Sequence, residues 1–533
     1  MKDVRRLLQK LTTSLAARLP AVTGGPEEEI SPSSFTFRLC VKLCLPALIV
    51  GAIIRISFLA VTPTAYYGKD SNSYFTTANR LWSEGEFKLP SKRRYLYPLF
   101  LAVTPALPGS TATGVAVLQH ATGLATVLGI GWIVGHVVRR PRIWVPPVTL
   151  LAAAWPRMLW YEHEMIAEVF VLAALVLTVA MALPLTRLRS QSGLLWFLGA
   201  AVLIIAFKPH GRPFWLALVG LAAIYSWGRW NLAHALAVAG SLVVLATGGS
   251  DSQGSWLLLS SALPLVKTEG KVYQEYRDLL RPFILESRKD FPNYATRQKL
   301  FKKDLDGEDP TDPLGPEWAK LCRDRKRYGK VARTLALEGI LSQPLTFSGI
   351  IYRKVMLALS DSNAGARIRP DQFWQAQIQA NNGRWLTRRL PEMRLVFGTD
   401  EEGFRRMAAD GLQDKLWLAS PIDWLDSAVA WTYYEPGTRE DDPPRFGLRW
   451  IGYLALFGFV SCLFPSRLKR TAIVWFPALF YLGLVYSVGD SVSRYLHPAD
   501  WCLLVVIALG GDALVDLGQS LFRKWKEHKA SLA

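Results

Sequence analysis

Residues 41–62 read VKLCLPALIVGAIIRISFLAVT, and residues 65–101 read AYYGKDSNSYFTTANRLWSEGEFKLPSKRRYLYPLFL. The first stretch is apolar and long enough for an α-helix to cross the hydrocarbon core of a bilayer, which takes about 20 residues. The second places one carboxylate, Asp70, just beyond the end of that helix. Acidic side chains at such a junction face water or take part in chemistry. Together the two stretches predict a spanning helix followed by a polar segment that carries a candidate functional residue.

Similar apolar runs recur in both end regions of the chain, and half of all residues (50%) are hydrophobic. We therefore predict an all-α polytopic membrane protein with a bundle of about ten spanning helices. The predicted spans are 41–62, 113–138, 143–160, 165–185, 193–207, 214–227, 233–248, 450–464, 472–488 and 500–517.

The basic residues orient these spans. In an alternating ten-helix arrangement the basic clusters all fall on one side, and the excess of Lys and Arg marks the cytoplasmic side of a membrane. We therefore expect the N- and C-termini to be cytoplasmic, with residues 1–40 forming a basic amphipathic segment and a linker. The clusters are Lys2 with Arg5 and Arg6, residues 139–142, Arg187 with Arg189, residues 467–470 and residues 523–526.

The hydrophobic pattern stops between residues 251 and 447, which predicts an external domain between a first membrane module (41–250) and the last spans and tail (448–533). Acidic and basic residues nearly balance there, so the net charge of +19 arises elsewhere and follows membrane topology rather than nucleic-acid binding. We predict amphipathic helices at 271–286, 328–341 and 347–359. The apolar face of the last, which includes Leu345 and Val355, would lie on the bilayer or cover a site.

In this topology, residues far apart in the sequence meet at the outer side, which is the usual form of an active site built at a membrane surface. The sequence has no phosphate-binding glycine loop of the Walker type and no dinucleotide-binding fingerprint, and Cys322 is the one cysteine of the external segment. These features argue against ATP, nicotinamide cofactors and a disulfide framework. The outer polar residues are Asp70, residues 92–94, Glu162, His163, Glu164, residues 208–212, Asp490, Arg494 and His497.

Several of these segments resemble the GT-C membrane glycosyltransferases, in particular the branch of protein O-mannosyltransferases and lipid A aminoarabinose transferases. The first external loop (63–112) carries Asp70 and Tyr74, then ANRL at 78–81, Gly85, Phe87, Arg94 and Tyr97-Pro98. Further similar pieces are WPRMLWY at 155–161 with AEVF at 167–170, FKP at 207–209 and SRYLHP at 493–498.

The resemblance implies an inverting transfer of a sugar from a polyprenyl phosphate, such as undecaprenyl phosphate, to an acceptor hydroxyl of a glycan, glycolipid or protein. It also implies a bacterial inner (plasma) membrane and a periplasmic active site. An inverting displacement needs a carboxylate base beside the acceptor, and Asp70 is the candidate. Asp70 also stands where it would cap a helix, since a carboxylate is stabilised at a helix N-terminus. The two roles are compatible.

The leaving phosphate needs cations, for which Arg suits bidentate contact and Lys acts as a point charge. Snorkelling to lipid headgroups is the ordinary alternative for such residues. The donor-phosphate candidates are Arg94, Lys208, His210, Arg212 and Arg494.

A second acidic or acceptor-binding set comprises Tyr74, Glu162, Glu164, Glu168 and His497. Carboxylate oxygens of Glu162 and Glu164 suit Mg²⁺ or Mn²⁺ that bridges the donor phosphate. Hydrogen bonding to the acceptor and plain solvation are the alternatives.

For Arg55 we expect snorkelling, and for Tyr486 and Tyr495 a place in the interfacial aromatic belt.

Two other functions are open to a chain of this pattern. A lipid-linked oligosaccharide polymerase or ligase with a diphosphate donor is also a multispan enzyme. Enzymes of that class lack an Asp near the start of the chain that is followed by Tyr, Ala and Gly, as Asp70 is here. A flippase or transporter would show paired half-repeats and polar residues at mid-membrane depth, which this sequence lacks.

Overall fold

The computed structural model is helical throughout the part of the chain that it describes, apart from one isolated β-bridge between Tyr66 and Glu164. The described residues are 35–66, 69–86, 94–104, 110–208, 211–228, 230–246, 252–270, 272–289, 291, 324–360, 402–403, 406, 450–488 and 496–532. Asp490, Arg494, Tyr495, His210 and Cys322 lie outside them.

Nine of the ten predicted spans each fall mainly on one helix, and the helical structure confirms the predicted fold class. In the membrane module and the C-terminal region the helices are α2 (Phe37–Val61), α3 (Lys69–Glu84), α4 (Leu96–Val103), α5 (Thr111–Val137), α6 (Pro141–Ala153), α7 (Pro156–His163), α8 (Glu168–Ala182), α9 (Gln191–Phe207), α10 (Arg212–Tyr225), α11 (Leu232–Ala246), α24 (Trp450–Cys462), α25 (Pro465–Val488) and α26 (Asp500–Leu532).

By length and composition, α2, α5 and the stretch His497–Ser531 can each cross a membrane alone. Shorter apolar helices occupy Glu168–Ala182, Gln191–Phe207, Arg212–Tyr225, Leu232–Val244 and Thr471–Ser487. The chain is an all-helical polytopic membrane protein.

The predicted single span at 143–160 is wrong, because the structure divides it into α6 and α7. Trp155 adopts an extended conformation (ψ 117°) directly before Pro156, the first residue of α7. A residue that precedes proline is driven out of the helical region by the proline ring, and proline has no N–H to continue the hydrogen-bond ladder. The break lets α7 turn and carry Glu162 and His163 into the bundle.

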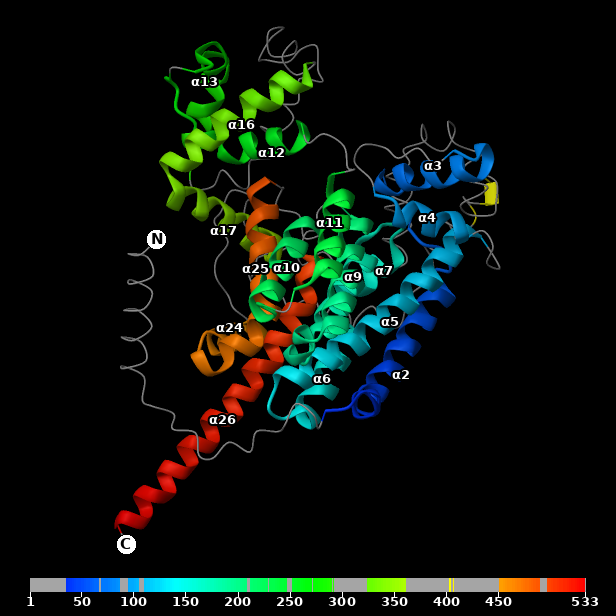
Figure 1. Ribbon diagram of the computed structural model, residues 1–533, viewed down its shortest axis with the longest axis vertical. Coiled ribbons are helices and arrows are strands. Elements are labelled where there is room, and N and C mark those ends of the chain that lie inside the picture. Colours follow the sequence, from blue (N-terminus) through cyan, green and yellow to red (C-terminus); the bar gives the residue numbers. More distant parts are fainter. Residues whose placement is uncertain are drawn as a thin grey trace.

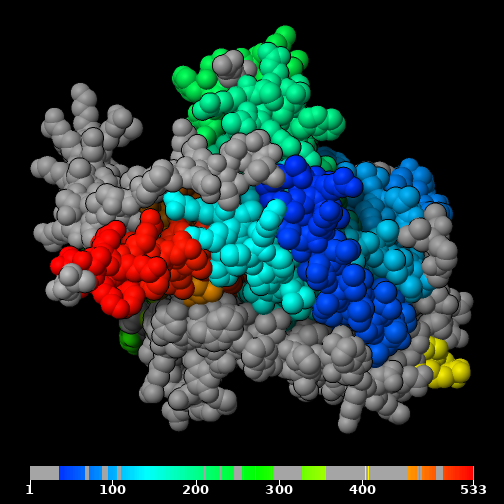
Figure 2. Space-filling model, turned by 90° about the horizontal axis from the view of Figure 1, so that it is seen from below, coloured from blue at the N-terminus to red at the C-terminus, as the bar shows by residue number. Residues whose placement is uncertain are grey.

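The spanning helices pack into one bundle, with α2, α5 and α6 along one side and α26 leaving it obliquely (Figure 1). In the view from below, α2, α6 and α26 lie side by side (Figure 2). The bundle core is aliphatic and aromatic, with Trp155 and Trp501 fully buried in it.

The helices α12 (Ser252–Ala262), α13 (Gln274–Lys289), α16 (Arg325–Ser342) and α17 (Pro344–Ser360) lie together at the opposite end from the C-terminus (Figure 1). They share a second apolar core that includes Leu263, Leu280 and Leu335. The three predicted amphipathic helices thus form, with bounds shifted by a few residues.

The apolar face of α17 packs within the protein. Phe347 and Ile350 are buried in the second core. Ile351 and Val355 pack against Tyr486 and Leu496. Tyr486 is fully buried there, so its expected place in an interfacial belt is wrong. Leu345 remains 87% exposed.

Candidate functional site

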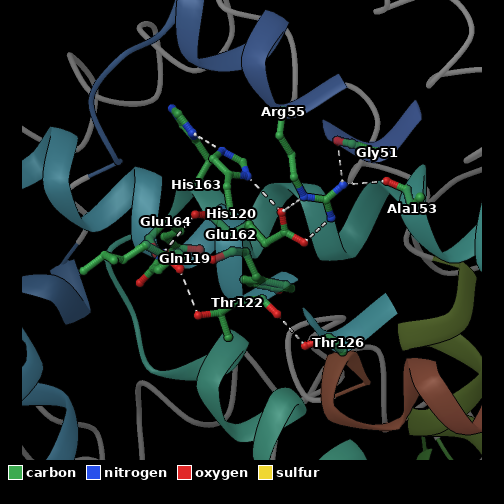
Figure 3. Close-up of polar contacts among 12 residues, drawn as sticks. Gly51, Arg55, Gln119, His120, Thr122, Thr126, Ala153, Glu162, His163 and Glu164 are labelled. Atoms are coloured by element: carbon green, nitrogen blue, oxygen red, sulfur yellow. Dashed lines mark hydrogen bonds and ion pairs between the residues drawn. The ribbon is translucent and has the colours of Figure 1, made fainter. Parts of the chain in front are cut away.

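A buried ion pair joins the first span to the end of α7. Arg55 donates from Nε to Glu162 Oε2 at 2.7 Å and from Nη2 to Glu162 Oε1 at 2.6 Å, and the two side chains are 2% and 1% exposed (Figure 3). His120 of α5 also contacts Glu162, with 2.8 Å between Nδ1 and Oε2. The Glu162 carboxylate of α7 therefore binds side chains of both α2 and α5.

The third guanidinium nitrogen of Arg55, Nη1, donates hydrogen bonds to backbone carbonyl oxygens. Its Nη1 donates to Gly51 O at 3.1 Å and to Ala153 O at 2.9 Å (Figure 3). Ala153 is the last residue of α6, and the last carbonyls of a helix have no partner within it. The expected snorkelling of Arg55 to the headgroups is therefore wrong, because its guanidinium is held inside the bundle by the break between α6 and α7.

His163 continues the network. Its Nδ1 lies 3.1 Å from His120 Nε2, and its ring meets the ring of Phe58 edge-on at 4.4 Å between centroids. Burial, then the neighbouring His120, lower the pKa of His163 well below its ordinary value. For Glu162 burial opposes ionisation, but Arg55 and His120 outweigh it and lower its pKa. The network therefore runs from the Glu162 carboxylate through the His120 ring to the His163 ring.

Gly123 makes room for this carboxylate. A Cβ atom on Gly123 would lie 1.9 Å from Glu162 Oε1, closer than real Cβ atoms come to any neighbour. A glycine on α5 is therefore required for Glu162 to reach Arg55 and His120.

Gln119 holds the chain just after α7. Its Nε2 donates to Glu162 O at 3.0 Å and to Glu164 O at 2.7 Å, while its Oε1 accepts from Tyr97 Oη at 2.8 Å. Tyr97 in turn meets the ring of Tyr74 edge-on at 4.8 Å between centroids. The predicted residues Tyr74 and Glu164 are thus linked through Tyr97 and Gln119.

The isolated β-bridge fixes the segment that leads to Asp70. Tyr66 N–H donates to His163 O at 2.6 Å, and Met165 N–H donates to Tyr66 O at 2.8 Å. Helix α3 begins at Lys69, so the backbone of Asp70 lies in the first turn of that helix. Four residues span at most about 14 Å between Cα atoms. The Cα atom of Asp70 therefore lies within about 14 Å of that of Tyr66, which is paired with the Glu162–Glu164 segment.

Glu168 and Lys208 form a second ion pair. Lys208 Nζ contacts Glu168 Oε1, and the side chains are 11% and 3% exposed. Glu168 is the first residue of α8, where the helix dipole favours a carboxylate, and Lys208 caps the end of α9. Arg212 begins α10 and is half-buried, while His210 lies outside the described residues.

Arg94 lies before α4 and is buried. Its Nη1 donates to Val244 O in α11 at 2.8 Å, which ties the segment 63–112 to a helix far along the chain. Its predicted contact with donor phosphate stays a prediction.

His497 belongs to a third cluster, at the start of α26. Its Nδ1 lies 3.2 Å from Asp500 Oδ2, and Arg157 Nη2 lies 3.3 Å from Asp500 Oδ1. The ring of Tyr161, from α7, packs 4.6 Å from the His497 ring. The cluster therefore joins α7 to the last span. Arg494 lies outside the described residues.

A divalent cation at Glu162 and Glu164 stays a prediction. Both oxygens of Glu162 accept hydrogen bonds from Arg55 and His120, so a cation would have to displace one of them. Within the described ranges, no three His, Cys, Asp or Glu side chains are placed to hold a metal ion.

Sequence reasoning missed Gln119, His120, Arg157 and Asp500. The available signal was the presence of polar or charged side chains within apolar runs, which membrane proteins retain where those groups find partners.

No family model and no curated protein sequence matches this chain. Among solved structures, the chain is similar to the crystal structure of ArnT from Cupriavidus metallidurans bound to undecaprenyl phosphate, with 13% identity over 89% of this chain and 78% of that chain and a TM-score of 0.29. At this TM-score the two folds are not closely alike, so the function has to be argued from the residues of the site.

Proposed function

We propose that this protein is an inverting glycosyltransferase that moves a sugar from a polyprenyl-phosphate donor to an acceptor hydroxyl at the outer face of a bacterial inner membrane. The acceptor belongs to a cell-envelope glycan, lipid or protein. The termini would be cytoplasmic and the active site periplasmic.

One observation carries the proposal: the backbone leading to Asp70 is hydrogen-bonded to the Glu162–Met165 segment. Arg55, His120 and Gln119 hold that segment through hydrogen bonds, which supports the proposal that a base at Asp70 would have a fixed backbone beside it. A catalytic group needs such support, because small displacements of a base from the reactive geometry cost large factors in rate.

In this proposal Asp70 accepts the proton of the acceptor hydroxyl as the oxygen attacks the anomeric carbon. The bond from that carbon to the phosphate oxygen breaks, and polyprenyl phosphate leaves. Lys208, Arg494 and Arg94 would meet the charge of the phosphate, and Glu168 would hold Lys208 in place. Mg²⁺ or Mn²⁺ at Glu162 and Glu164 would supply further charge if bound.

The proposal is tested by mass spectrometry of lipid extracts and surface glycans from cells with and without this protein. Loss of the protein should leave a polyprenyl-monophosphate sugar unconsumed and one envelope glycan, glycolipid or glycoprotein unmodified. Complementation with Asp70→Asn should fail to reverse either change. Accumulation of a diphosphate-linked oligosaccharide would instead identify a polymerase or ligase. Unchanged lipids and glycans would argue against glycosyl transfer altogether.

A further inference from the structure

The last helix continues far beyond the bundle. Helix α26 has 33 residues, about 50 Å at 1.5 Å per residue, whereas the hydrocarbon core of a bilayer is about 30 Å thick. Its C-terminal part leaves the bundle obliquely as a single helix (Figure 1). A continuous helix at this length must extend past the hydrocarbon, and its surface there needs a partner or water.

One face of α26 is pinned to the bundle just where it emerges. Arg140 donates to Asp512 Oδ1 at 3.1 Å, to Asp516 Oδ1 at 2.8 Å and to Gln519 Oε1 at 2.9 Å. Arg467 also contacts Asp516, at 2.5 Å. These ion pairs fix the rotation of α26 about its own axis.

The opposite face is apolar and exposed. Leu514, Leu517, Leu521 and Trp525 follow one another at helical spacing and are 46%, 44%, 59% and 56% exposed. Residues advance by about 100° each around a helix, so Trp525 lies about 180° from Asp516. The exposed apolar stripe therefore begins at Leu514, where α26 leaves the buried core, and continues to Trp525 on the side away from Asp516.

Cations border this stripe. By the same spacing Lys524 lies on one edge and Lys529 on the other. The ammonium of Lys529 stands 5.6 Å from the Trp525 ring, and that of Lys526 stands 5.0 Å from the Phe522 ring. An apolar stripe with an aromatic residue and lysines along its edges is the pattern of helices that lie in the headgroup layer of anionic membranes.

We propose that residues 518–531 of α26 are an interfacial helix that binds anionic phospholipid headgroups in the leaflet beside the turn between α5 and α6. The lipid surface is the fitting partner because the exposed apolar stripe starts where α26 leaves the bundle and has lysines along its borders. The side chains of Leu521, Phe522 and Trp525 enter the headgroup layer, while the lysines meet phosphate. This inference is independent of the glycosyl transfer proposed above.

The test is hydrogen exchange of the full-length protein in nanodiscs that hold one copy each. The discs contain either phosphatidylcholine alone or phosphatidylcholine with one quarter phosphatidylglycerol. Exchange of residues 518–531 should be roughly tenfold slower with phosphatidylglycerol, and high salt should reverse the effect, because the contact is partly electrostatic.

Two matched variants locate the contact. Leu521→Ser with Trp525→Ser removes the stripe and should abolish the slowing. Arg523→Gln with Ala530→Ser alters the other face and should preserve it. Exchange of the span at Leu504–Ile507 reports whether each variant is folded.

Equal exchange in both kinds of disc would overturn the proposal. So would protection that appears only in discs holding two copies, since a second chain would then be the partner.

Discussion

Arg55 and Glu162, 107 positions apart in the sequence, form a bidentate ion pair inside the helical bundle, with N–O distances of 2.7 and 2.6 Å. The pair joins α2 to the end of α7, and His120 adds α5 through the same carboxylate. A buried pair of this kind is strongly destabilised when one partner is removed, because the other charge is left buried alone.

The first prediction follows from that asymmetry. Arg55→Met should destabilise the protein by about 3–5 kcal/mol, measured by thermal unfolding in detergent. The double variant Arg55→Met with Glu162→Met should regain much of that loss, because no charge is left unpaired. As a control, Lys289→Ala breaks an exposed pair with Glu286 (3.2 Å) and should change unfolding little. Equal losses in the single and double variants would show that the pair contributes through shape rather than charge.

The second prediction concerns the close approach at Gly123. Gly123→Ala should lower the unfolding temperature and the activity, because its Cβ would displace the carboxylate of Glu162. Gly199→Ala is the matched control, since a Cβ on that helical glycine meets nothing within 4 Å and alanine favours helix. If the clash is the cause, Glu162→Ala should add little further loss in the Gly123→Ala background. Identical behaviour of the two glycine variants would contradict this account.

The helices could be predicted from the sequence because long apolar runs determine them locally. The interruption at Trp155-Pro156 could not be located in the same way, because Pro146 and Pro147 also lie in that run and are tolerated inside α6. Which proline ends a helix depends on the packing around it rather than on its local sequence.

Much of the candidate site could not be predicted, since its contacts depend on how distant helices align. Asp70, Glu168 and Lys208 were identifiable from their positions beside spans, but the partner of Arg55 was not. A lone arginine in an apolar run snorkels or pairs, and only the register of α2 against α7 decides between the two.

The third prediction tests the proposed base. Asp70→Asn should reduce turnover by about 10²-fold or more while donor binding and expression stay near normal, because an amide cannot accept the acceptor proton. Glu84→Gln changes a carboxylate at the exposed other end of α3 and should be silent. Near-normal turnover of Asp70→Asn would leave that residue a helix cap alone.

The fourth prediction separates two roles of Lys208. Lys208→Ala should weaken binding of a polyprenyl-phosphate donor more than binding of acceptor, and Arg494→Ala should do the same. Lys208→Ala also removes the ion-pair partner of Glu168 seen here, so a second variant is needed to interpret the loss of donor binding. Lys208→Ala with Glu168→Ala leaves no unpaired carboxylate. Donor binding that stays weak in this double variant supports phosphate contact, whereas recovery would assign Lys208 a structural role.

A phosphate-free polyprenol analogue completes that experiment. Its binding should be insensitive to Lys208→Ala, because the charge that lysine meets belongs to the phosphate. An equal loss for the analogue would contradict the assignment.

The last prediction concerns residues 251–447. A polyprenyl donor must enter sideways from the bilayer, whereas a polar acceptor approaches from water, so the site needs two openings. Helix α17 of this segment packs through Ile351 and Val355 against Tyr486 and Leu496, next to the cluster of His497 and Asp500. If the proposed function holds, the segment would border the aqueous opening and select the acceptor. Replacing it with a short flexible linker should abolish transfer to the natural acceptor while donor binding in membranes stays measurable. Donor binding reports that the bundle is still folded. Transfer that survives with the same acceptor preference would place acceptor selection in the bundle.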